Sequence, residues 1–409
     1  MRILYVSQYF PPEMGAPPAR VHEFAREWVH LGHEVTVLTA FPHHPTGVKR
    51  REDRGVLTRR ESLDGIDVIR AYVYAAANRG TLRRMLSYAS FMLSASLVGS
   101  LRAARPDLVL ATSPQLLCAA AGYALSLRFG VPFVFELRDL WPESILAVEV
   151  MRENAIVRGL KRLAAFLYAR ATRIVAVGEG YKQGVISRYG VAGEKIEIVP
   201  NGFDPSTFVP GPRDNEIRRE LGWGDRFVLL YIGTHGMAHA LDKVLDAAAE
   251  LRREADLLFA FVGEGAEKAA LEARAARLEL PNVQFVGQQP KARVPLFYAA
   301  CDVCLVTLRN TELFLEVLPS KIFESLAMER PVLFTGGGEA RRLIERSQSG
   351  VCIAPEDPAA LARAARELAA RRPELAAMGK RGRAFVEAHY DRRALARQYL
   401  EILGRIARA

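Results

Sequence analysis

Short apolar segments rich in β-branched residues recur along the whole chain, and helical patterns separate most of them. The first set comprises residues 3–6, 35–38, 108–111, 133–135, 174–177 and 196–199, and the second comprises 227–231, 257–262, 283–286, 303–306, 332–334 and 351–353. Near-continuous apolar strands that alternate with helices are typical of parallel sheets covered on both faces. The pattern occurs twice in 409 residues, which is longer than a single core usually grows. We therefore expect an α/β chain of two doubly wound domains.

A segment rich in proline, glycine and charge separates the two sets of strands. It begins with Pro-Asn-Gly-Phe-Asp-Pro at 200–205 and continues through 209–215. We expect an N-terminal domain of residues 1–204, a C-terminal domain of 205–386, and a helix at 387–409 that returns to the N-terminal domain. Ligands of such sheets bind beyond the carboxyl ends of the strands, so we expect the two domains to face each other across a cleft.

The positive charge of the chain is uneven. The net charge is +10, and residues 1–200 alone carry 26 Lys and Arg against 18 Asp and Glu. A basic N-terminal half indicates an anionic partner, with an ordinary solvated surface as the alternative. No nucleic-acid-binding module is recognisable, so we expect no nucleic-acid partner.

The four cysteines have no disulfide pattern, and the chain opens directly on a strand-like segment without the pattern of a signal peptide. We expect a cytoplasmic protein. Cys301 and Cys304 have the CxxC spacing of metal sites, but a second ligand pair is missing from the sequence. We interpret them as strand residues.

The loop after the first strand, residues 8–20, ends where a helical pattern begins. Its backbone N–H groups and the helix dipole can face an anion, and Gly15 would let the backbone approach a ligand closely. The loop matches neither a GxGxxG dinucleotide loop nor a P-loop. A purely structural strand-to-helix turn is the alternative.

Two carboxylates bracket a predicted helix start in residues 311–327. The helix begins near Ser320, so Glu316 precedes it and Glu324 lies about one turn inside it. Both carboxylates can accept hydrogen bonds from sugar hydroxyls, while Lys321 and the helix N-terminus offer positive potential to a diphosphate. Glu324 as an exposed helix residue beside a solvated Lys321 is the alternative.

The spacing of Glu316 and Glu324 is E-x7-E, which resembles the signature of retaining glycosyltransferases of family 4. Those enzymes have the GT-B fold of two Rossmann-like domains. Residues 200–204 resemble the P-N-G-x-D linker of the family, residues 262–265 its G-x-G turn, and residues 351–358 its last strand and turn. Residues 138–143 and 318–324 are similar to the branch that includes bacterial N-acetylfucosaminyl (L-fucosamine-type) transferases of surface polysaccharide synthesis.

The resemblance implies a role for each matching residue. Glu324 would bind the ribose hydroxyls and Glu316 the donor sugar, while Lys321 and its neighbouring N–H groups would bind the diphosphate. Arg138 and Asp139 fall at a strand end near the reacting carbon, and with Glu316 they form the expected catalytic set. The expected substrate-binding set consists of Gly15, Thr234, Gly263, Ser320, Lys321 and Glu324.

The chemistry implied by the resemblance needs no side-chain nucleophile. The anomeric configuration is retained, and the leaving phosphate itself takes the acceptor proton. Because the sequence contains no Asp-x-Asp metal-binding pair, we expect no metal and no cofactor; positive side chains and helix dipoles would stabilise the leaving diphosphate. The expected partners are a nucleotide-diphosphate sugar, with UDP as the expected nucleotide, and a glycan or polyprenyl-diphosphate-linked acceptor.

The sequence departs from the family at the diphosphate. Many members carry an Arg and a Lys shortly after the first strand of the second domain, and residues 233–241 have neither at the expected positions. Lys321 is the candidate substitute. His235 and His239 are hypothetical phosphate donors, with surface or packing histidines as the alternative. Pro319 stands near a Gly of the commoner motif and removes one N–H donor.

Residues 85–101 form an uncharged, serine-containing helical segment between Arg83, Arg84, Arg102 and Arg105. It is too short for a membrane span, so the alternatives are an interfacial helix and a buried domain helix. In the first case Phe91, Met92, Leu93 and Leu97 would enter lipid, and the enzyme would sit peripherally on the inner face of an anionic membrane.

Two other functions remain open at this stage. A nucleotide-sugar 2-epimerase of GT-B fold would share the architecture and the donor but not the E-x7-E context. A non-enzymatic, two-lobed sugar-binding protein would also pair two α/β lobes.

Overall fold

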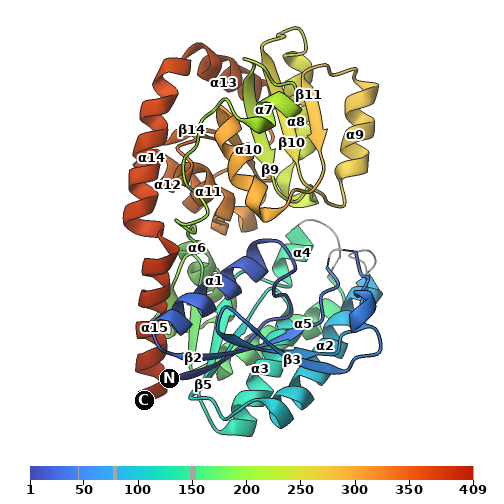
Figure 1. Ribbon diagram of the computed structural model, residues 1–409, viewed down its shortest axis with the longest axis vertical. Coiled ribbons are helices and arrows are strands. Elements are labelled where there is room, and N and C mark those ends of the chain that lie inside the picture. The colour runs from blue at the N-terminus through green and yellow to red at the C-terminus, as the bar shows by residue number, and fades with distance from the viewer. Residues whose placement is uncertain (45, 77–80, 148–152, 409) are drawn as a thin grey trace. The chain divides into compact units, whose positions relative to one another are not determined.

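The chain divides into two compact units, each built on one sheet (Figure 1). The computed structural model describes residues 1–44, 46–76, 81–147 and 153–408. Unit 1 consists of Met1–Asn201 and Arg392–Ala409, and unit 2 of Gly202–Asp391. The sequence placed the two boundaries at 204/205 and 386/387, a few residues from where the contacts divide the chain.

The sheet of unit 1 runs in the order β3-β4-β2-β1-β5-β6-β7-β8, parallel except for β3, which pairs antiparallel with β4. Its strands are β1 (Arg2–Val6), β2 (Glu34–Ala40), β3 (Thr58–Leu63), β4 (Ile66–Ala71), β5 (Leu108–Thr112), β6 (Phe133–Leu137), β7 (Arg173–Ala176) and β8 (Ile196–Ile198). Every strand expected from the apolar runs is present. The β3–β4 hairpin is additional, because Arg59, Arg60 and Glu61 hide the apolar signal of β3.

Helices cover both faces of this sheet (Figure 1). They are α1 (Ala16–His30), α2 (Thr81–Arg102), α3 (Leu116–Phe129), α4 (Glu143–Ala147), α5 (Ala155–Arg170), α6 (Glu179–Tyr189) and α15 (Arg392–Arg408), with 3-10 turns η1 (Arg51–Asp53) and η2 (Gly193–Lys195). Helix α15 packs beside α1, where Trp28 Nε1 donates a hydrogen bond to the carbonyl of Ala396 at 2.9 Å. The last helix of the chain therefore completes the core of the first unit.

Unit 2 carries a fully parallel sheet in the order β11-β10-β9-β12-β13-β14. Its strands are β9 (Phe227–Ile232), β10 (Leu257–Val262), β11 (Val283–Val286), β12 (Val303–Thr307), β13 (Val332–Thr335) and β14 (Gly350–Ile353). Its helices are α7 (Glu216–Glu220), α8 (Leu241–Glu250), α9 (Lys268–Arg277), α10 (Val294–Ala300), α11 (Ser320–Ala327), α12 (Gly338–Ser347), α13 (Pro358–Ala370) and α14 (Leu375–Tyr390). The 3-10 turns are η3 (Met237–His239), η4 (Lys291–Arg293), η5 (Glu312–Glu316) and η6 (Arg372–Glu374).

Local sequence explains where the key helices begin and end. The sequence predicted a loop over residues 8–20 before the first helix, but α1 begins at Ala16 because Pro17 and Pro18 suit a first turn whose N–H groups have no helical partner. The single C-terminal helix expected at 387–409 is two helices, α14 and α15, separated by the extended backbone of Asp391.

A buried ionic cluster ties distant segments of unit 1 together. The Arg20 guanidinium of α1 contacts the Glu136 carboxylate of β6 at 3.0 Å and donates to the carbonyls of Val199 and Pro200 at 2.9 and 2.6 Å. Tyr5 of β1 donates to the same carboxylate at 2.6 Å. Burial alone would raise the pKa of Glu136, but the nearby guanidinium groups and the Tyr5 hydroxyl lower it below its usual range. The carboxylate therefore stays charged and holds α1 against the sheet.

We expect Glu136→Ala to destabilise unit 1 by roughly 3–5 kcal/mol, because it leaves the Arg20 charge buried without its counter-ion. Urea denaturation measures the loss. Glu52→Ala is the matched control: its carboxylate is exposed, lies 3.5 Å from Arg50, and should change stability by less than about 0.5 kcal/mol. Equal effects of the two substitutions would contradict a stabilising role of the buried cluster.

Candidate active site

The candidate donor site lies where strand order reverses in unit 2. Strands β9 and β12 are neighbours, and the chain leaves them toward opposite sides of the sheet, so their carboxyl ends form the switch point at which ligands of such sheets bind. The residues after β9 pack on those after β10: His235 N donates to the carbonyl of Glu264 at 2.9 Å. A Cβ on Gly263 would lie 2.0 Å from the carbonyl oxygen of Gly233, and φ at Gly263 is +137°. Only glycine at this position allows the two turns to pack this closely.

Lys321 reaches the end of β9 from the first turn of α11. Its Nζ lies 4.0 Å from the centroid of the Tyr231 ring, and a Cβ on Gly233 would lie 3.1 Å from that nitrogen. The nitrogen is buried, and within the described part of the chain it has no hydrogen-bond partner. Burial lowers the pKa of Lys321 to about 7, while the nearby Glu324 carboxylate opposes that change. The structure thus brings Lys321 to the backbone turn that contains Thr234.

Glu324 lies one turn further along α11 and is half-buried, as is Ser320 at the start of the helix. The hydroxyl of Tyr298, in α10, donates a hydrogen bond to Glu324 Oε2 at 2.9 Å. This contact orients the carboxylate on the first turns of α11. Tyr298 carries no motif, and sequence reasoning did not find it.

Glu316 ends the 3-10 turn η5 and is not in an irregular loop. A glycine run before α12 lets this turn pack directly on the helix: a Cβ on Gly338 would lie 1.8 Å from the carbonyl oxygen of Leu315, and φ at Gly338 is +69°. A Cβ on Gly337 would lie 2.7 Å from the Leu315 side chain. The position of Glu316 therefore depends on glycines that follow it by about twenty residues, which its own motif did not indicate.

Both histidines of the turn after β9 lie against the Tyr231 ring. The ring centroids of His235 and His239 are each 5.7 Å from that of Tyr231. Burial lowers the pKa of His235 to about 4 and that of His239 to about 3, and the Lys321 charge acts in the same direction. Both rings are therefore neutral near pH 7. His235 is 0% exposed, so of the surface and packing alternatives only packing fits it.

Unit 1 gathers the remaining predicted residues at the carboxyl edge of its own sheet. Gly15 has φ +128° and caps α1. The buried carboxylate of Glu13 fixes this loop, because its Oε1 accepts from the backbone N–H groups of His43 and His44 at 2.9 and 2.8 Å. Arg138 reaches the loop from the end of β6 and donates to the carbonyl of Pro17 at 3.2 Å.

Asp139 and Arg138 share one partner. Ser113, which follows β5, accepts hydrogen bonds at its hydroxyl oxygen from the backbone N–H groups of both residues, at 3.3 and 2.8 Å respectively. Burial raises the pKa of Asp139 to about 6, although its carboxylate accepts a hydrogen bond from Ser144 at 2.9 Å. Burial also lowers the pKa of Arg138 to about 10, and Glu136 opposes that change. Sequence reasoning missed Ser113 and Glu13, since neither belongs to a recognisable motif.

No three His, Cys, Asp or Glu side chains group into a metal-binding arrangement within the described ranges. The sulfur atoms of Cys301 and Cys304 lie 3.6 Å apart in the core of unit 2, and Cys301 donates to the carbonyl of Tyr298 at 3.2 Å. Both thiols are packing groups beside the donor site.

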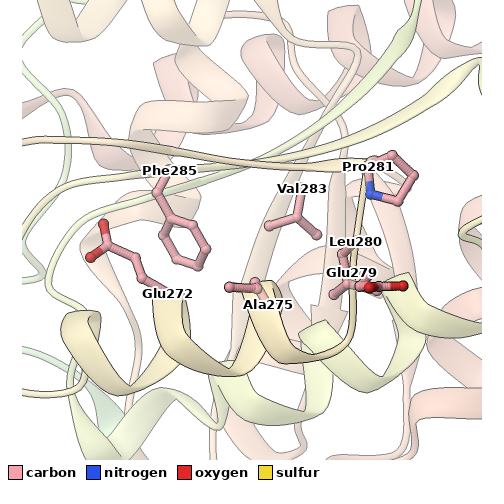
Figure 2. A pocket seen from close by; sticks show the side chains of 8 residues that line it. Glu272, Ala275, Glu279, Leu280, Pro281, Val283 and Phe285 are labelled. Atoms are coloured by element: carbon pink, nitrogen blue, oxygen red, sulfur yellow. The ribbon is translucent and has the colours of Figure 1, made fainter.

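Two hollows of the surface lie away from the predicted residues. One has a volume of about 480 Å³. Figure 2 shows its lining, where Phe285 and Val283 face Ala275 of α9. The other, of about 970 Å³, lies in unit 1 near the amino ends of β1 and β5 and includes Arg2 and Asp107. Because ligands of parallel sheets bind at the carboxyl ends of strands, neither hollow is the candidate active site.

Comparison with known proteins agrees with the division of the chain into units 1 and 2. The model of the family Glycosyltransferase Family 4 matches residues 19–207, and that of Glycosyl transferases group 1 matches residues 213–385. The Pseudomonas aeruginosa protein WbjE, named as a glycosyltransferase, is 30% identical over 76% of this chain and 79% of its own length. The Escherichia coli protein WcaI, named for colanic acid biosynthesis, is 27% identical over 88% and 90%. The chain belongs to the group 1/family 4 glycosyltransferases.

Solved structures show the same GT-B fold. Anabaena HepE in complex with UDP aligns with a TM-score of 0.73 at 19% identity, covering 99% of this chain and 100% of that protein. WaaG, a glycosyltransferase involved in lipopolysaccharide biosynthesis, aligns with a TM-score of 0.72 at 19% identity, covering 98% and 99%. The fold of the protein is therefore GT-B, with two Rossmann-like units.

Proposed function

We propose that this enzyme is a retaining, metal-independent glycosyltransferase that uses a UDP-sugar in the synthesis of a cell-surface polysaccharide. The observation that carries the proposal is the pair Glu316 and Glu324 on either side of Lys321, at the strand-order reversal of unit 2. Two lines support the choice of substrates: HepE was solved with UDP and with UDP-glucose, and WcaI is named for colanic acid biosynthesis. The L-fucosamine-type motifs make an N-acetylfucosaminyl donor the first to test.

The proposed reaction divides the work between two sets of residues. Unit 2 binds the donor: Glu324 accepts hydrogen bonds from the ribose, Glu316 from the transferred sugar, and Lys321 and the N-terminal N–H groups of α11 stabilise the diphosphate. Unit 1 binds a glycan or polyprenyl-diphosphate-linked acceptor beside Arg138 and Asp139. The acceptor hydroxyl attacks on the face that the diphosphate leaves, and its proton passes to the leaving phosphate. The anomeric configuration is thus retained.

One incubation separates this proposal from the alternatives. The protein is mixed with a panel of nucleotide sugars, with and without saccharide acceptors, and the products are analysed by NMR. A retaining transferase is supported if nucleoside diphosphate is released and the new glycosidic bond has the same anomeric configuration, α or β, as the donor. Formation of an epimer would support a 2-epimerase, and unchanged ligand a sugar-binding protein. The family assignment favours the first outcome.

We expect the enzyme to release nucleoside diphosphate at the same rate in excess EDTA as in added Mg²⁺. The physical reason is that Lys321 and the α11 dipole stabilise charge on the leaving group without a cation. The rate is measured in parallel with added Mg²⁺ as the control. Loss of turnover in EDTA with recovery in Mg²⁺ or Mn²⁺ would replace the proposal by a metal-dependent one.

We expect Glu324→Ala to weaken UDP binding by roughly 2–3 kcal/mol, about 30- to 150-fold, because it removes charge-assisted hydrogen bonds to the ribose. Glu316→Ala should lower kcat more than it changes UDP affinity, since its partner is the transferred sugar. Calorimetry with UDP separates the two roles. Tyr298→Phe, which removes only the hydrogen bond that orients Glu324, is the control with a smaller loss. Equal losses of UDP affinity in both glutamate variants would contradict the division of roles.

We also propose that unit 1 docks on an anionic membrane surface through α2. Leu86, Leu93, Leu97 and Leu101 of this helix are between 49% and 75% exposed, at spacings of seven, four and four residues that put them on one face. The expectation that Phe91 enters lipid is wrong, because Phe91 is 0% exposed and packs in the core. No helix within the described ranges is long and apolar enough to cross a membrane.

Neighbouring helices extend this apolar face and add positive charge to it. Leu127 of α3 and Phe166 of α5 are 65% and 43% exposed, and α3 contacts both α2 and α5. Seven exposed arginines lie on these helices or just after α2: Arg83, Arg102, Arg105, Arg128, Arg158, Arg162 and Arg170. Exposed leucine and arginine side chains on the same helices suit the boundary between acyl chains and anionic headgroups.

Vesicle co-sedimentation tests the docking. We expect binding to vesicles with anionic lipid at low salt, mostly released at high salt, with each basic residue contributing about 1 kcal/mol. Arg83→Glu/Arg102→Glu should weaken binding roughly thirty-fold or more, since at least two such contributions are lost. Leu93→Gln/Leu97→Gln should remove the salt-resistant part. Leu57→Gln changes a leucine that is 67% exposed outside this face and should have no effect. Indifference to anionic lipid at low salt would favour a soluble acceptor.

A further inference from the structure

Three side chains that can carry positive charge surround the ring of Tyr231 at the end of β9. Lys321 Nζ is 4.0 Å from the ring centroid, and the rings of His235 and His239 are each centred 5.7 Å from it. The Tyr231 hydroxyl itself is occupied, because it donates to the carbonyl of Thr234 at 2.6 Å. Three cation-forming groups thus share one aromatic ring at the candidate donor site.

Most polar atoms of this cluster lack a hydrogen-bond partner, which an anion could provide. Lys321 Nζ and both ring nitrogens of His235 are buried, and among the described residues none of these three atoms has a hydrogen-bond partner. His239 differs, since its Nδ1 lies 3.3 Å from the carbonyl oxygen of Thr307. Buried polar atoms are normally paired, so an unpaired group of this kind points to a ligand that completes it.

Few counter-charges face the cluster. Lys321 faces Glu324 on its own helix, Cys304 on β12, Tyr231 on β9 and the two histidines. His235 faces Lys268 of α9 and Glu264, which pair with each other at 2.5 Å. Burial lowers the pKa of Lys321 to about 7 and that of His235 to about 4. Above pH 7 the cluster is therefore largely uncharged before a ligand arrives.

We propose that the donor diphosphate binds to this cluster together with one proton, which converts the Lys321 amine to an ammonium, while neutral His235 donates one ring N–H to a phosphate oxygen. The inference rests on the proposed function, because it takes the anion to be a nucleoside diphosphate. The proton comes from solvent on binding and returns to solvent when the nucleoside diphosphate leaves. No covalent bond forms or breaks.

The proposal has a consequence for affinity. A diphosphate beside Lys321 favours its charged form and raises its pKa in the complex. Between pH 7 and that higher pKa the free protein must gain a proton to bind, so the Kd should rise up to about ten-fold per pH unit. An arginine stays charged throughout this range, so it should bind without the proton.

Calorimetry of UDP with the 409-residue chain tests this between pH 7.5 and 9. In this range the terminal phosphate of the nucleotide, with a pKa of about 6, no longer titrates. Titrations in HEPES and in Tris, which differ in ionisation heat, count the protons. We expect uptake approaching one proton at pH 8.5 and a Kd that rises with pH. Uridine, which lacks the diphosphate, should bind without proton uptake and without this slope.

Variants of Lys321 and His235 show which residue takes up the proton when UDP binds. Lys321→Arg and Lys321→Met should both lose the pH slope, the first with UDP binding retained and the second with weaker binding. His235→Gln, which keeps a neutral N–H donor, should retain the slope. UDP binding without proton uptake, or a slope that survives in Lys321→Met, would overturn this inference alone. Failure of UDP, GDP and dTDP to bind at any pH would instead overturn the proposed function, and this inference with it.

Discussion

Parallel strand pairing in unit 2 is the constraint on which the candidate site depends. Because β9, β10 and β12 run in the same direction, their carboxyl ends open at one edge, and the reversal of strand order between β9 and β12 separates the loops there. Helix α11 can then direct Lys321 onto the ring of Tyr231, and the glycine turns after β9 and β10 leave room for it. A sheet with mixed strand directions would send these residues to opposite edges.

In unit 1, a buried ion pair fixes the residues at the carboxyl edge of the parallel sheet. The charge of Glu136 in β6 is balanced by Arg20 of α1, which also binds carbonyls at the end of the unit's first chain segment. This arrangement fixes the start of α1, and hence the Gly15 loop, relative to the end of β6, where Arg138 and Asp139 lie. The buried, paired cluster of Arg20 and Glu136 thus holds Arg138 and Asp139 in place at the edge of the sheet.

The two candidate sites share an electrostatic feature. Arg138 Nε in unit 1 and Lys321 Nζ in unit 2 are buried nitrogen atoms without a hydrogen-bond partner in the described part of the chain. Burial disfavours the charged form of each, and one carboxylate on a nearby strand or helix turn, Glu136 or Glu324, limits that effect. Burying such groups without a hydrogen-bond partner costs free energy. They are well suited to bind phosphates, because an anionic ligand supplies the missing interactions.

The sequence alone determined the two parallel α/β units, since every expected apolar strand is present and buried strands between helices leave few other architectures. It also predicted Glu316, Lys321 and Glu324 as site residues, because their motif lies within one short segment. The β3–β4 hairpin escaped detection because charged residues mask its alternation. The partners of the site residues were decided only by the tertiary structure: Tyr298 on Glu324, Gly338 against Leu315 next to Glu316, and His235 beside Lys321. Those contacts join segments far apart in the chain, and no local pattern encodes which strand ends become neighbours when the sheet assembles.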